Sequence, residues 1–392
     1  MRVQCAPHIT VREAERIFAE VNEANDGKLG IEELVRWWPK DYGSWLEAES
    51  DRGLAMRWRS VNHLIQAPFT CHVVGSGYWG GQPVPGVEGG PQAIRATGLI
   101  PRIAKLGWRV SDAGDLPFTR LEDDAACKTT GVRNPRNVGG ACERLHNHLL
   151  PFAKRNQFCL TLGGDHSLAM GSVSAMAQGW PDLKVLWVDA HADINTPAIS
   201  PSGNLHGMPL AFLLGLVDTS TVPGFEWLKP CLKPENVVFI GLRDVDPLEK
   251  RVLRELKIRA FSMTEVDKFG IGEVMSRAME HLTPARDCPV HCSFDIDSID
   301  PSEAPSTGTR VRGGLTYREG NYIVEELAAS GCLVSMDIVE VNTAIGDVRD
   351  VVQTATVASD IVRSALGASV LVSDHHFDPV SLRVPSRGPK RQ

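Results

Sequence analysis

Residues 185–193 read Val-Leu-Trp-Val-Asp-Ala-His-Ala-Asp, an apolar run that leads directly into two carboxylates and an imidazole. A strand turns alternate side chains to one face. Extension through residue 193 would therefore place Asp189, His191 and Asp193 together, with the two alanines facing away. Aspartate and histidine side chains that converge in this way outline a metal site.

Two further stretches repeat the arrangement. Leu-Gly-Gly-Asp-His-Ser at 162–167 ends one apolar run with His166, and Cys-Ser-Phe-Asp-Ile-Asp at 292–297 ends another with Asp295 and Asp297. One Asp beside one His at a strand end is more often a hydrogen-bonded structural pair. Three such motifs favour a metal centre, and six oxygen and nitrogen ligands are more than one ion normally takes while staying open to substrate. The set therefore fits two ions.

The charges of these side chains favour the same interpretation. Four carboxylates in one site would not all stay ionised without compensation, because burying unpaired charge costs several kcal/mol per ion. An Asp/His shell without thiolates fits Mn(II) or a similar first-row ion better than structural zinc. Two such ions about 3.5 to 4 Å apart can share and acidify one water, which makes a nucleophile at neutral pH.

The composition excludes several other classes of protein. A chain of 392 residues allows one large α/β domain and something smaller. The net charge is −7, and basic residues cluster only in the short tail 383–391, so we expect no nucleic-acid partner. The longest apolar run, 208–217, is too short to span a bilayer. Nine scattered cysteines without a C-x-x-C pair, and residues 1–20 without an apolar signal core, predict a cytoplasmic protein.

Residues 1–70 are expected to form a small all-α extension. Within it, residues 22–33 resemble an EF-hand loop, with Asp26, Gly27 and Glu33 at loop positions five, six and twelve. Asn22 and Ala24 at positions one and three remove charge and an oxygen ligand, so calcium binding is not expected. The alternative is a helical packing or oligomerisation module that keeps the EF-hand shape without the ion.

From residue 71 onward, strand-like and helix-like segments alternate. Apolar runs occur at 71–76, 109–112, 158–162, 184–189, 236–242, 259–263, 290–296 and 333–341. Helix-compatible segments between them include 144–154, 271–282, 317–329 and 348–366. This alternation predicts a parallel sheet covered on both faces over residues 71–370, with a tail at 371–392. Ligands bind beyond the carboxyl ends of such strands, where all three motifs lie.

The three motifs together resemble the signatures of the ureohydrolase family. Five further stretches resemble arginases in particular: 193–197, 202–207, 241–247, 313–319 and 336–342. The resemblance runs from about residue 72 to about residue 367. It implies a three-layer α/β/α fold with a mainly parallel eight-stranded sheet and two Mn(II) ions per subunit.

The resemblance also implies roles for the ligands. His166 and Asp193 would bind one manganese ion, His191 and Asp297 the other, and Asp189 and Asp295 would bridge both. A bridging hydroxide would attack the guanidinium carbon of L-arginine and yield L-ornithine and urea.

Three residues are expected to act in catalysis. Glu340 can pair with the guanidinium cation and hold its carbon in place, which is catalysis by orientation. His206 would shuttle protons, and Asp193 would relay the proton of the attacking hydroxide. Taken singly, Glu340 would be read as a surface carboxylate and His206 as a structural histidine.

Substrate choice would rest on an outer ring of polar residues. Asn195, Ser200 and Ser202 would donate to an α-carboxylate, and Asp246, with Glu249 through water, would accept from an α-ammonium. Thr309 belongs to the same set. Ser200 stands where arginases usually have threonine and is followed by Pro201, so we expect altered loop stiffness and KM.

Assembly and alternative functions follow from the same comparison. The resemblance implies a trimer with Arg318 and Glu319 at the contact. Asp374, His375, His376 and Asp378 lie in the tail that does not resemble arginases, and are interpreted as an incidental polar run. The alternatives are an agmatinase or other guanidino-compound ureohydrolase, and a calcium-responsive binding module with a vestigial core.

Overall fold

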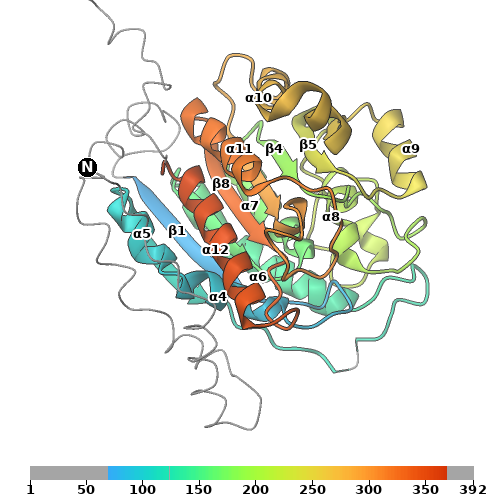
Figure 1. The fold of residues 1–392 in the computed structure, drawn as a ribbon. Coiled ribbons are helices and arrows are strands. Elements are labelled where there is room, and N and C mark those ends of the chain that lie inside the picture. The colour runs from blue at the N-terminus through green and yellow to red at the C-terminus, as the bar shows by residue number, and fades with distance from the viewer. Residues whose placement is uncertain (1–68, 123, 369–392) are drawn as a thin grey trace, which may run out of the picture. The chain divides into compact units, whose positions relative to one another are not determined.

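One parallel β-sheet organises the described part of the chain (Figure 1). The structure is a computed structural model that describes residues 69–122 and 124–368. Eight strands lie in the order β2-β1-β3-β8-β7-β4-β5-β6, and all neighbouring pairs are parallel. The predicted α/β fold with a parallel eight-stranded sheet is confirmed.

The strands are short and mostly buried. Their bounds are β1 (Thr70–Ser76), β2 (Arg109–Asp115), β3 (Phe158–Gly163), β4 (Lys184–Val188), β5 (Val237–Leu242), β6 (Arg259–Ser262), β7 (Val290–Asp295) and β8 (Leu333–Val339). Every residue of β3, β5, β7 and β8 is buried, whereas the edge strand β2 is largely exposed. Strands covered on both faces read as continuous apolar runs, which is why the sequence indicated them.

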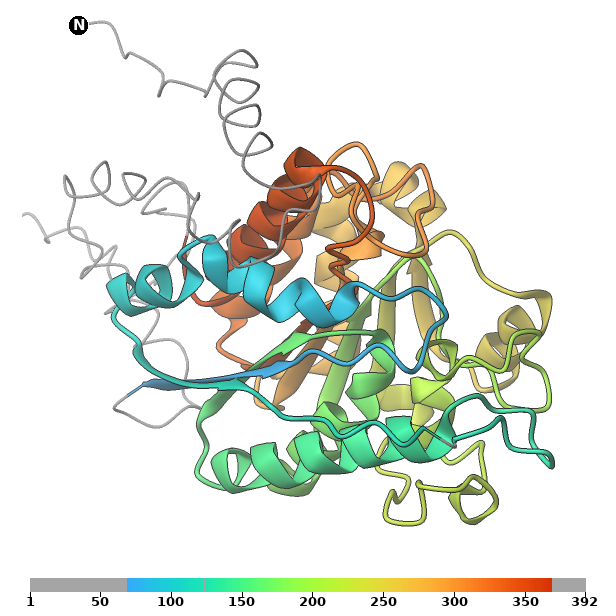
Figure 2. The same cartoon turned by 90° about the horizontal axis from the view of Figure 1, so that it is seen from below.

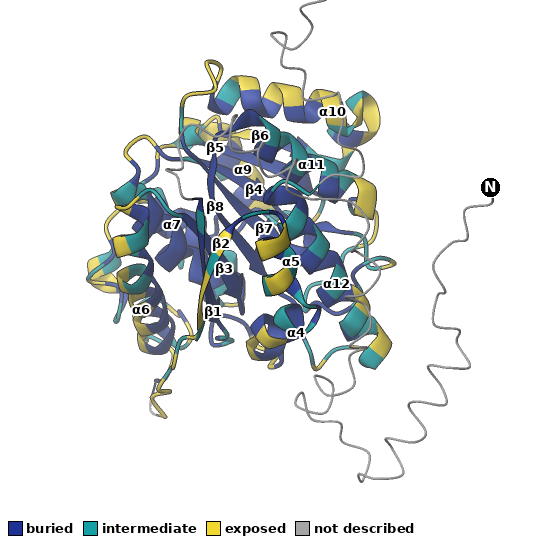
Figure 3. Cartoon of the chain, turned by 90° about the vertical axis from the view of Figure 1, so that its left-hand side faces the viewer, coloured by how far each residue is buried: buried dark blue, intermediate teal, exposed yellow. Residues whose placement is uncertain are grey.

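Helices cover both faces of the sheet (Figures 1 and 2). Their bounds are α4 (Gly90–Ala96), α5 (Leu99–Lys105), α6 (Pro135–Ala153), α7 (Ala169–Gly179), α8 (Pro209–Leu213), α9 (Pro247–Glu255), α10 (Met263–Leu282), α11 (Tyr317–Ser330) and α12 (Val348–Ala365). Helices α6 and α7 pack together on one face, and α4, α5, α11 and α12 pack on the other. Figure 3 shows the strands between them as the buried centre.

Two helices are longer than predicted. Helix α6 begins at Pro135, nine residues before the predicted segment, because Asn134 in a left-handed conformation precedes a proline that suits the first helical position. Gly139 and Gly140 had obscured this start. Helix α10 is kinked at Gly270, which has φ 74°. The sequence pattern had predicted that the helix begins directly after this glycine, at residue 271. The helices predicted at 317–329 and 348–366 agree with α11 and α12 to within one residue.

The ends of two strands differ from the prediction in a way that matters for the site. Strand β4 ends at Val188, so the expectation of an extended chain through residue 193 is wrong, and Asp193 has φ 49°. Strand β8 ends at Val339, and Glu340 has φ 65°. Non-glycine residues rarely adopt positive φ. The chain turns sharply at both positions instead of continuing as a strand.

The described helices contain no segment that is both long and apolar enough to cross a membrane. All cysteines of the described residues are free thiols.

Candidate metal centre and substrate pocket

The predicted ligands and Glu340 meet above the carboxyl ends of four neighbouring strands. His166 follows β3, Glu340 follows β8, Asp295 ends β7, and Asp189 follows β4. Strands β3 and β4 are consecutive in the chain but are separated in the sheet by β8 and β7. A parallel sheet opens a crevice where consecutive strands diverge in this way.

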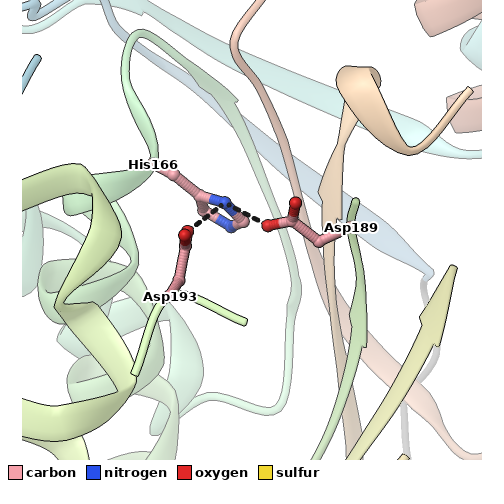
Figure 4. Close-up of side chains that lie close together, drawn as sticks. All are labelled: His166, Asp189 and Asp193. Atoms are coloured by element: carbon pink, nitrogen blue, oxygen red, sulfur yellow. Dashed lines mark ion pairs between the residues drawn. The ribbon is translucent and has the colours of Figure 1, made fainter. Parts of the chain in front are cut away.

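His166, Asp189 and Asp193 form the inner group (Figure 4). The Nδ1 atom of His166 lies 3.1 Å from an oxygen of Asp189 and 3.1 Å from an oxygen of Asp193. It also lies 3.2 Å from Asp295 Oδ2. All of these residues are buried. One nitrogen carries at most one proton, so it cannot donate to three carboxylates at once.

The three carboxylates around Nδ1 of His166 form an arrangement that a bound cation would stabilise. Nδ1 of His166 is buried and has no well-formed hydrogen bond, although three carboxylates surround it. The opposite nitrogen, Nε2, lies 2.9 Å from Ser293 Oγ, and the ring stacks on Trp187 at 4.2 Å between centroids. A metal-binding histidine is usually held this way, with one nitrogen anchored and the other aimed at the ion.

Asp189, His191 and Asp297 form the outer group. His191 Nδ1 lies 3.1 Å from Asp297 Oδ2 and 3.3 Å from Asp189 Oδ1. Asp189 therefore presents Oδ1 to the outer group and Oδ2 to the inner group. It is placed to bridge two ions. Asp295 lies beside both groups, since its Oδ1 accepts from the backbone N–H of Asp297 and its Oδ2 approaches His166.

The local charges favour bound cations. Burial raises the pKa of Asp295 well above its ordinary value, and Asp297 and Asp189 raise it further. Burial and the neighbouring Asp189 raise the pKa of Asp193 to about 6. In Asp189 burial acts in the same direction, but hydrogen bonds with His166 and His191 outweigh it and lower the pKa. Two imidazoles do not balance four carboxylates, and divalent cations would.

Glu340 and His206 lie together beside the inner group. Glu340 is buried, and its Oε1 accepts from the backbone N–H of His166 at 2.9 Å and lies 3.5 Å from His206 Nδ1. Burial lowers the pKa of His206, but Glu340 outweighs that effect and raises it. The surface-carboxylate reading of Glu340 is wrong, because only 2% of the residue is exposed.

A pocket opens over the outer group, and the six residues predicted to bind substrate all line it. They are Asn195, Ser200, Ser202, Asp246, Glu249 and Thr309. The same pocket is lined by His191, Asp193, Asp295, Asp297 and His206. Residues from the segments that follow β4, β5 and β7 thus surround one space above the carboxylates.

Hydrogen bonds indicate what the ring can offer to a ligand. The hydroxyl oxygens of Ser200 and Ser202 accept from the backbone N–H groups of Gly203 and Asn204, which leaves both hydroxyl protons to donate. Asn195 donates to Asp246 at 3.1 Å, and its Oδ1 is buried without a partner. Asn195 therefore presents an acceptor as well as the predicted donor.

Glu249 has a more structural position than predicted. Its two oxygens accept from the backbone N–H groups of Ile194 at 3.1 Å and Asp246 at 3.0 Å. It is the third residue of helix α9, and its two hydrogen bonds connect the loops that contain Ile194 and Asp246. Burial raises the pKa of Glu249 to about 7.

Several residues of the site were not singled out by sequence reasoning. Trp187 donates from Nε1 to Asp189 Oδ2 at 3.0 Å, and Ser293 contacts His166. Each precedes a metal-group aspartate by two residues on a strand, so the alternation of side chains could have found them. Asp244 and Asn204 also line the pocket and lie inside motifs quoted for the resemblance.

Comparison with known proteins identifies the family. The sequence model of the arginase family matches residues 69–367. The chain belongs to the arginase family. Arginase of Glaciozyma antarctica is 47% identical over 316 residues, which cover 80% of this chain and 92% of that protein. Human arginase-1 is 46% identical over 321 residues, covering 81% and 98%.

Solved arginase structures have the same fold. The arginase of Bacillus caldovelox superposes with a TM-score of 0.71 at 38% identity, covering 77% of this chain and all of that one. The prediction of an arginase-type ureohydrolase is confirmed. The EF-hand-like loop at 22–33 and the polar run at 374–378 lie outside the described residues and outside the family match.

Proposed function

We propose that this arginase-family chain hydrolyses L-arginine to L-ornithine and urea with two Mn(II) ions. The observation that carries the proposal is the position of the polar ring directly above the two Asp/His groups in one pocket. One molecule of arginine could place its guanidinium carbon beside the two Asp/His groups and its α-amino and α-carboxylate groups beside the polar ring. Water supplies the oxygen of urea, and the cleaved C–N bond leaves the amine of ornithine.

The chain's residues fit two ions. His166 and Asp193 would hold one and His191 and Asp297 the other, with Asp189 and Asp295 shared between them. This assignment is supported by the two oxygens of Asp189 facing different imidazoles. Two divalent ions in such a site lower the pKa of a shared water, which supplies a nucleophile at neutral pH.

Three side chains would handle the charge and the protons. Glu340 places a buried carboxylate beside the inner group, where it pairs with the guanidinium cation and orients it. Asp193 accepts the proton of the attacking water. His206, whose pKa Glu340 raises, donates a proton to the leaving amine.

The outer ring would select the amino-acid head. The free hydroxyl protons of Ser200 and Ser202 suit an α-carboxylate, and Asp246 suits an α-ammonium. Agmatine has no carboxylate and would leave these donors unpaired, which costs affinity. The ring therefore favours arginine over agmatine.

Urea release separates these substrates. The metal-free protein should release no urea, and added Mn(II) should restore release from L-arginine but not from agmatine at the same concentration. Preference for agmatine would overturn the choice of substrate. Release that survives complete chelation, measured together with residual metal content, would overturn the proposed metal chemistry.

We further propose that residues 71–370 are the catalytic domain, with a helical extension at 1–70 and a tail at 371–392. Deletion of residues 1–65 should leave urea release unchanged. A trimer with Arg318 and Glu319 at its contact and a cytoplasmic location stay predictions. Sedimentation of the full chain tests the first of these.

A further inference from the structure

Arg243 makes an unusual set of contacts at the edge of the metal centre. Its Nη2 donates to the carbonyl oxygen of Asp297 at 2.6 Å, and its Nη1 donates to that of Ser298 at 3.0 Å. Nη2 and Nε both donate to the carbonyl oxygen of Val311, at 2.8 and 3.1 Å. Nη1 also reaches the carbonyl oxygen of Gly241 at 3.3 Å. One guanidinium thus joins the end of β5, the turn after β7 and the 309–311 loop.

These partners are all backbone carbonyls. Within the described residues, no carboxylate forms an ion pair with Arg243. A guanidinium offers five donors in a rigid plane and no acceptor, and lysine cannot reproduce that geometry. Gly314 leaves room for it, since a Cβ there would lie 2.7 Å from Nη2. The site is built to hold a planar cation against carbonyl oxygens.

Two of the three segments that Arg243 joins support the outer group. Asp297 is a member of that group, and its Oδ2 accepts from Thr309 Oγ1 at 2.6 Å. Thr309 begins the 309–311 loop that Arg243 holds through Val311. The backbone N–H of Arg243 also donates to the carbonyl oxygen of Ala190 at 2.9 Å, next to His191. Among the described residues, the guanidinium forms no hydrogen bond with His166, Asp189 or Asp193.

We propose that Arg243 is a positioning residue for the outer group. Its guanidinium holds the backbone of Asp297 and the 309–311 loop together, so that Asp297 and His191 keep the spacing that one ion requires. Arg243 touches neither the ion nor the substrate. The inference rests on the proposed function, because it concerns one of the two ions proposed there.

A purely electrostatic role makes the opposite prediction. A cation so close to the site would repel a metal ion, and its removal would then tighten binding. Positioning predicts weaker binding at the outer group alone, by about ten- to a hundredfold, the usual effect of removing a group that orients a metal ligand. Metal affinity therefore distinguishes the two roles.

The test is titration of the metal-free full chain with Mn(II), following the free ion by electron paramagnetic resonance. Arg243→Met removes the fork, and Arg243→Lys keeps the charge without the planar geometry. Arg251→Met is the matched control, because its side chain is 68% exposed on α9 and pairs only with Glu255 among the described residues. Thermal unfolding of each metal-free variant checks that it is folded. Thr309→Val, which removes only the hydroxyl donated to Asp297, gives a second variant that spares the backbone contacts.

Wild type and Arg251→Met should each take up two ions, and the affinity of each ion should be the same in the two proteins. Both Arg243 variants should bind one ion normally and the second ten- to a hundredfold more weakly, with Thr309→Val shifted less in the same direction. In a His191→Ala background, which lacks the outer ion, replacing Arg243 should change nothing further. With excess Mn(II), the kcat of both Arg243 variants should recover.

Equal weakening of both ions, unchanged affinities or tighter binding would each overturn the positioning role. A wild-type protein that takes up fewer than two ions would overturn the proposed function and this inference with it. Two ions in wild type and two equally tight ions in Arg243→Met and Thr309→Val would overturn the inference alone.

Discussion

The inner and outer groups share Asp189 but are supported in different ways. The inner group is the more deeply buried, with the side chain of His166 only 1% exposed, and two side chains on strands support that histidine: Ser293 of β7 and Trp187 of β4. In the outer group the side chain of His191 is 23% exposed. Its supports come from loops, through Thr309 and the carbonyls held by Arg243.

This difference indicates how each half keeps its geometry. Strands in the centre of a buried sheet cannot shift without disturbing the packed core, so the inner group is positioned by the fold itself. Loops are more mobile, so the outer group depends on a few hydrogen bonds across them. The outer ion should therefore bind more weakly and exchange with solvent first.

The largest effect is expected where the two groups meet. Asp189→Asn removes the shared charge and one of the two bridging oxygens, which should abolish binding at both groups and lower kcat/KM about a thousandfold, corresponding to about 4 kcal/mol. Metal content after gel filtration and urea release measure this. Asp267→Asn, an exposed change on α10, is the control. Retention of one tightly bound ion would mean that Asp189 does not serve both groups.

The second largest effect is a difference in stability loss between His166→Ala in the inner group and His191→Ala in the outer group. His166→Ala removes a buried ring stacked on Trp187 and should lower the free energy of unfolding of the metal-free protein by about 3 kcal/mol. His191→Ala, at the more exposed position, should cost about 1 kcal/mol and leave one ion bound. Chemical denaturation and metal analysis give both quantities. Similar losses for the two variants would contradict the asymmetry.

Ser293→Ala is the inner counterpart of Thr309→Val. It leaves Nε2 of His166 buried without its 2.9 Å partner, which should weaken the inner ion about tenfold and leave the outer ion unchanged. The same manganese titration resolves the two sites. If Ser293→Ala weakened binding of the outer ion alone, Ser293 would not be a support of the inner group.

The smallest effect concerns His72, a buried histidine outside the metal centre that forms no ion pair within residues 69–122 and 124–368 and serves as a reference for His166 and His191. His72 stacks on Phe152, and its Nε2 lies 2.9 Å from His148 Nε2. Burial, and then His148, lower the pKa of His72 from 6.5 to about 4. Between these values the unfolded chain binds the proton and the folded chain does not, so stability falls as the pH drops below 6.5.

His72→Gln should remove this acid sensitivity. Between pH 7 and pH 5 the wild type should lose on the order of 1 kcal/mol more stability than the variant. Denaturation of the metal-free proteins at the two pH values measures the difference. Parallel losses in both proteins would mean that the acid effect comes from other groups, the metal centre included.

Much of the fold was predictable from local pattern. Central strands covered on both faces must be apolar throughout, so β3, β4, β5, β7 and β8 stood out, and the polar motifs at their ends indicated the site. Helix α6 was predicted too short because two glycines lower local helix propensity, whereas packing against α7 stabilises the helix. The contacts of individual side chains within the site were harder to predict from the sequence. Glu340 and Glu249 were predicted to act on the substrate, and nothing in the sequence indicated that the carboxylates of both also accept from backbone N–H groups.

The sequence by itself determined which aspartates and histidines form the two Asp/His groups of the candidate metal centre, because the end of each buried strand is encoded in a few adjacent residues. Only the tertiary structure decided that Asp189 faces two imidazoles, that Asp193 reaches the inner group through a left-handed turn, and that Arg243 holds carbonyls from three segments. The physical reason is that backbone carbonyls are the same in every residue. A site built from them carries no local signature, and it forms only when distant segments pack together.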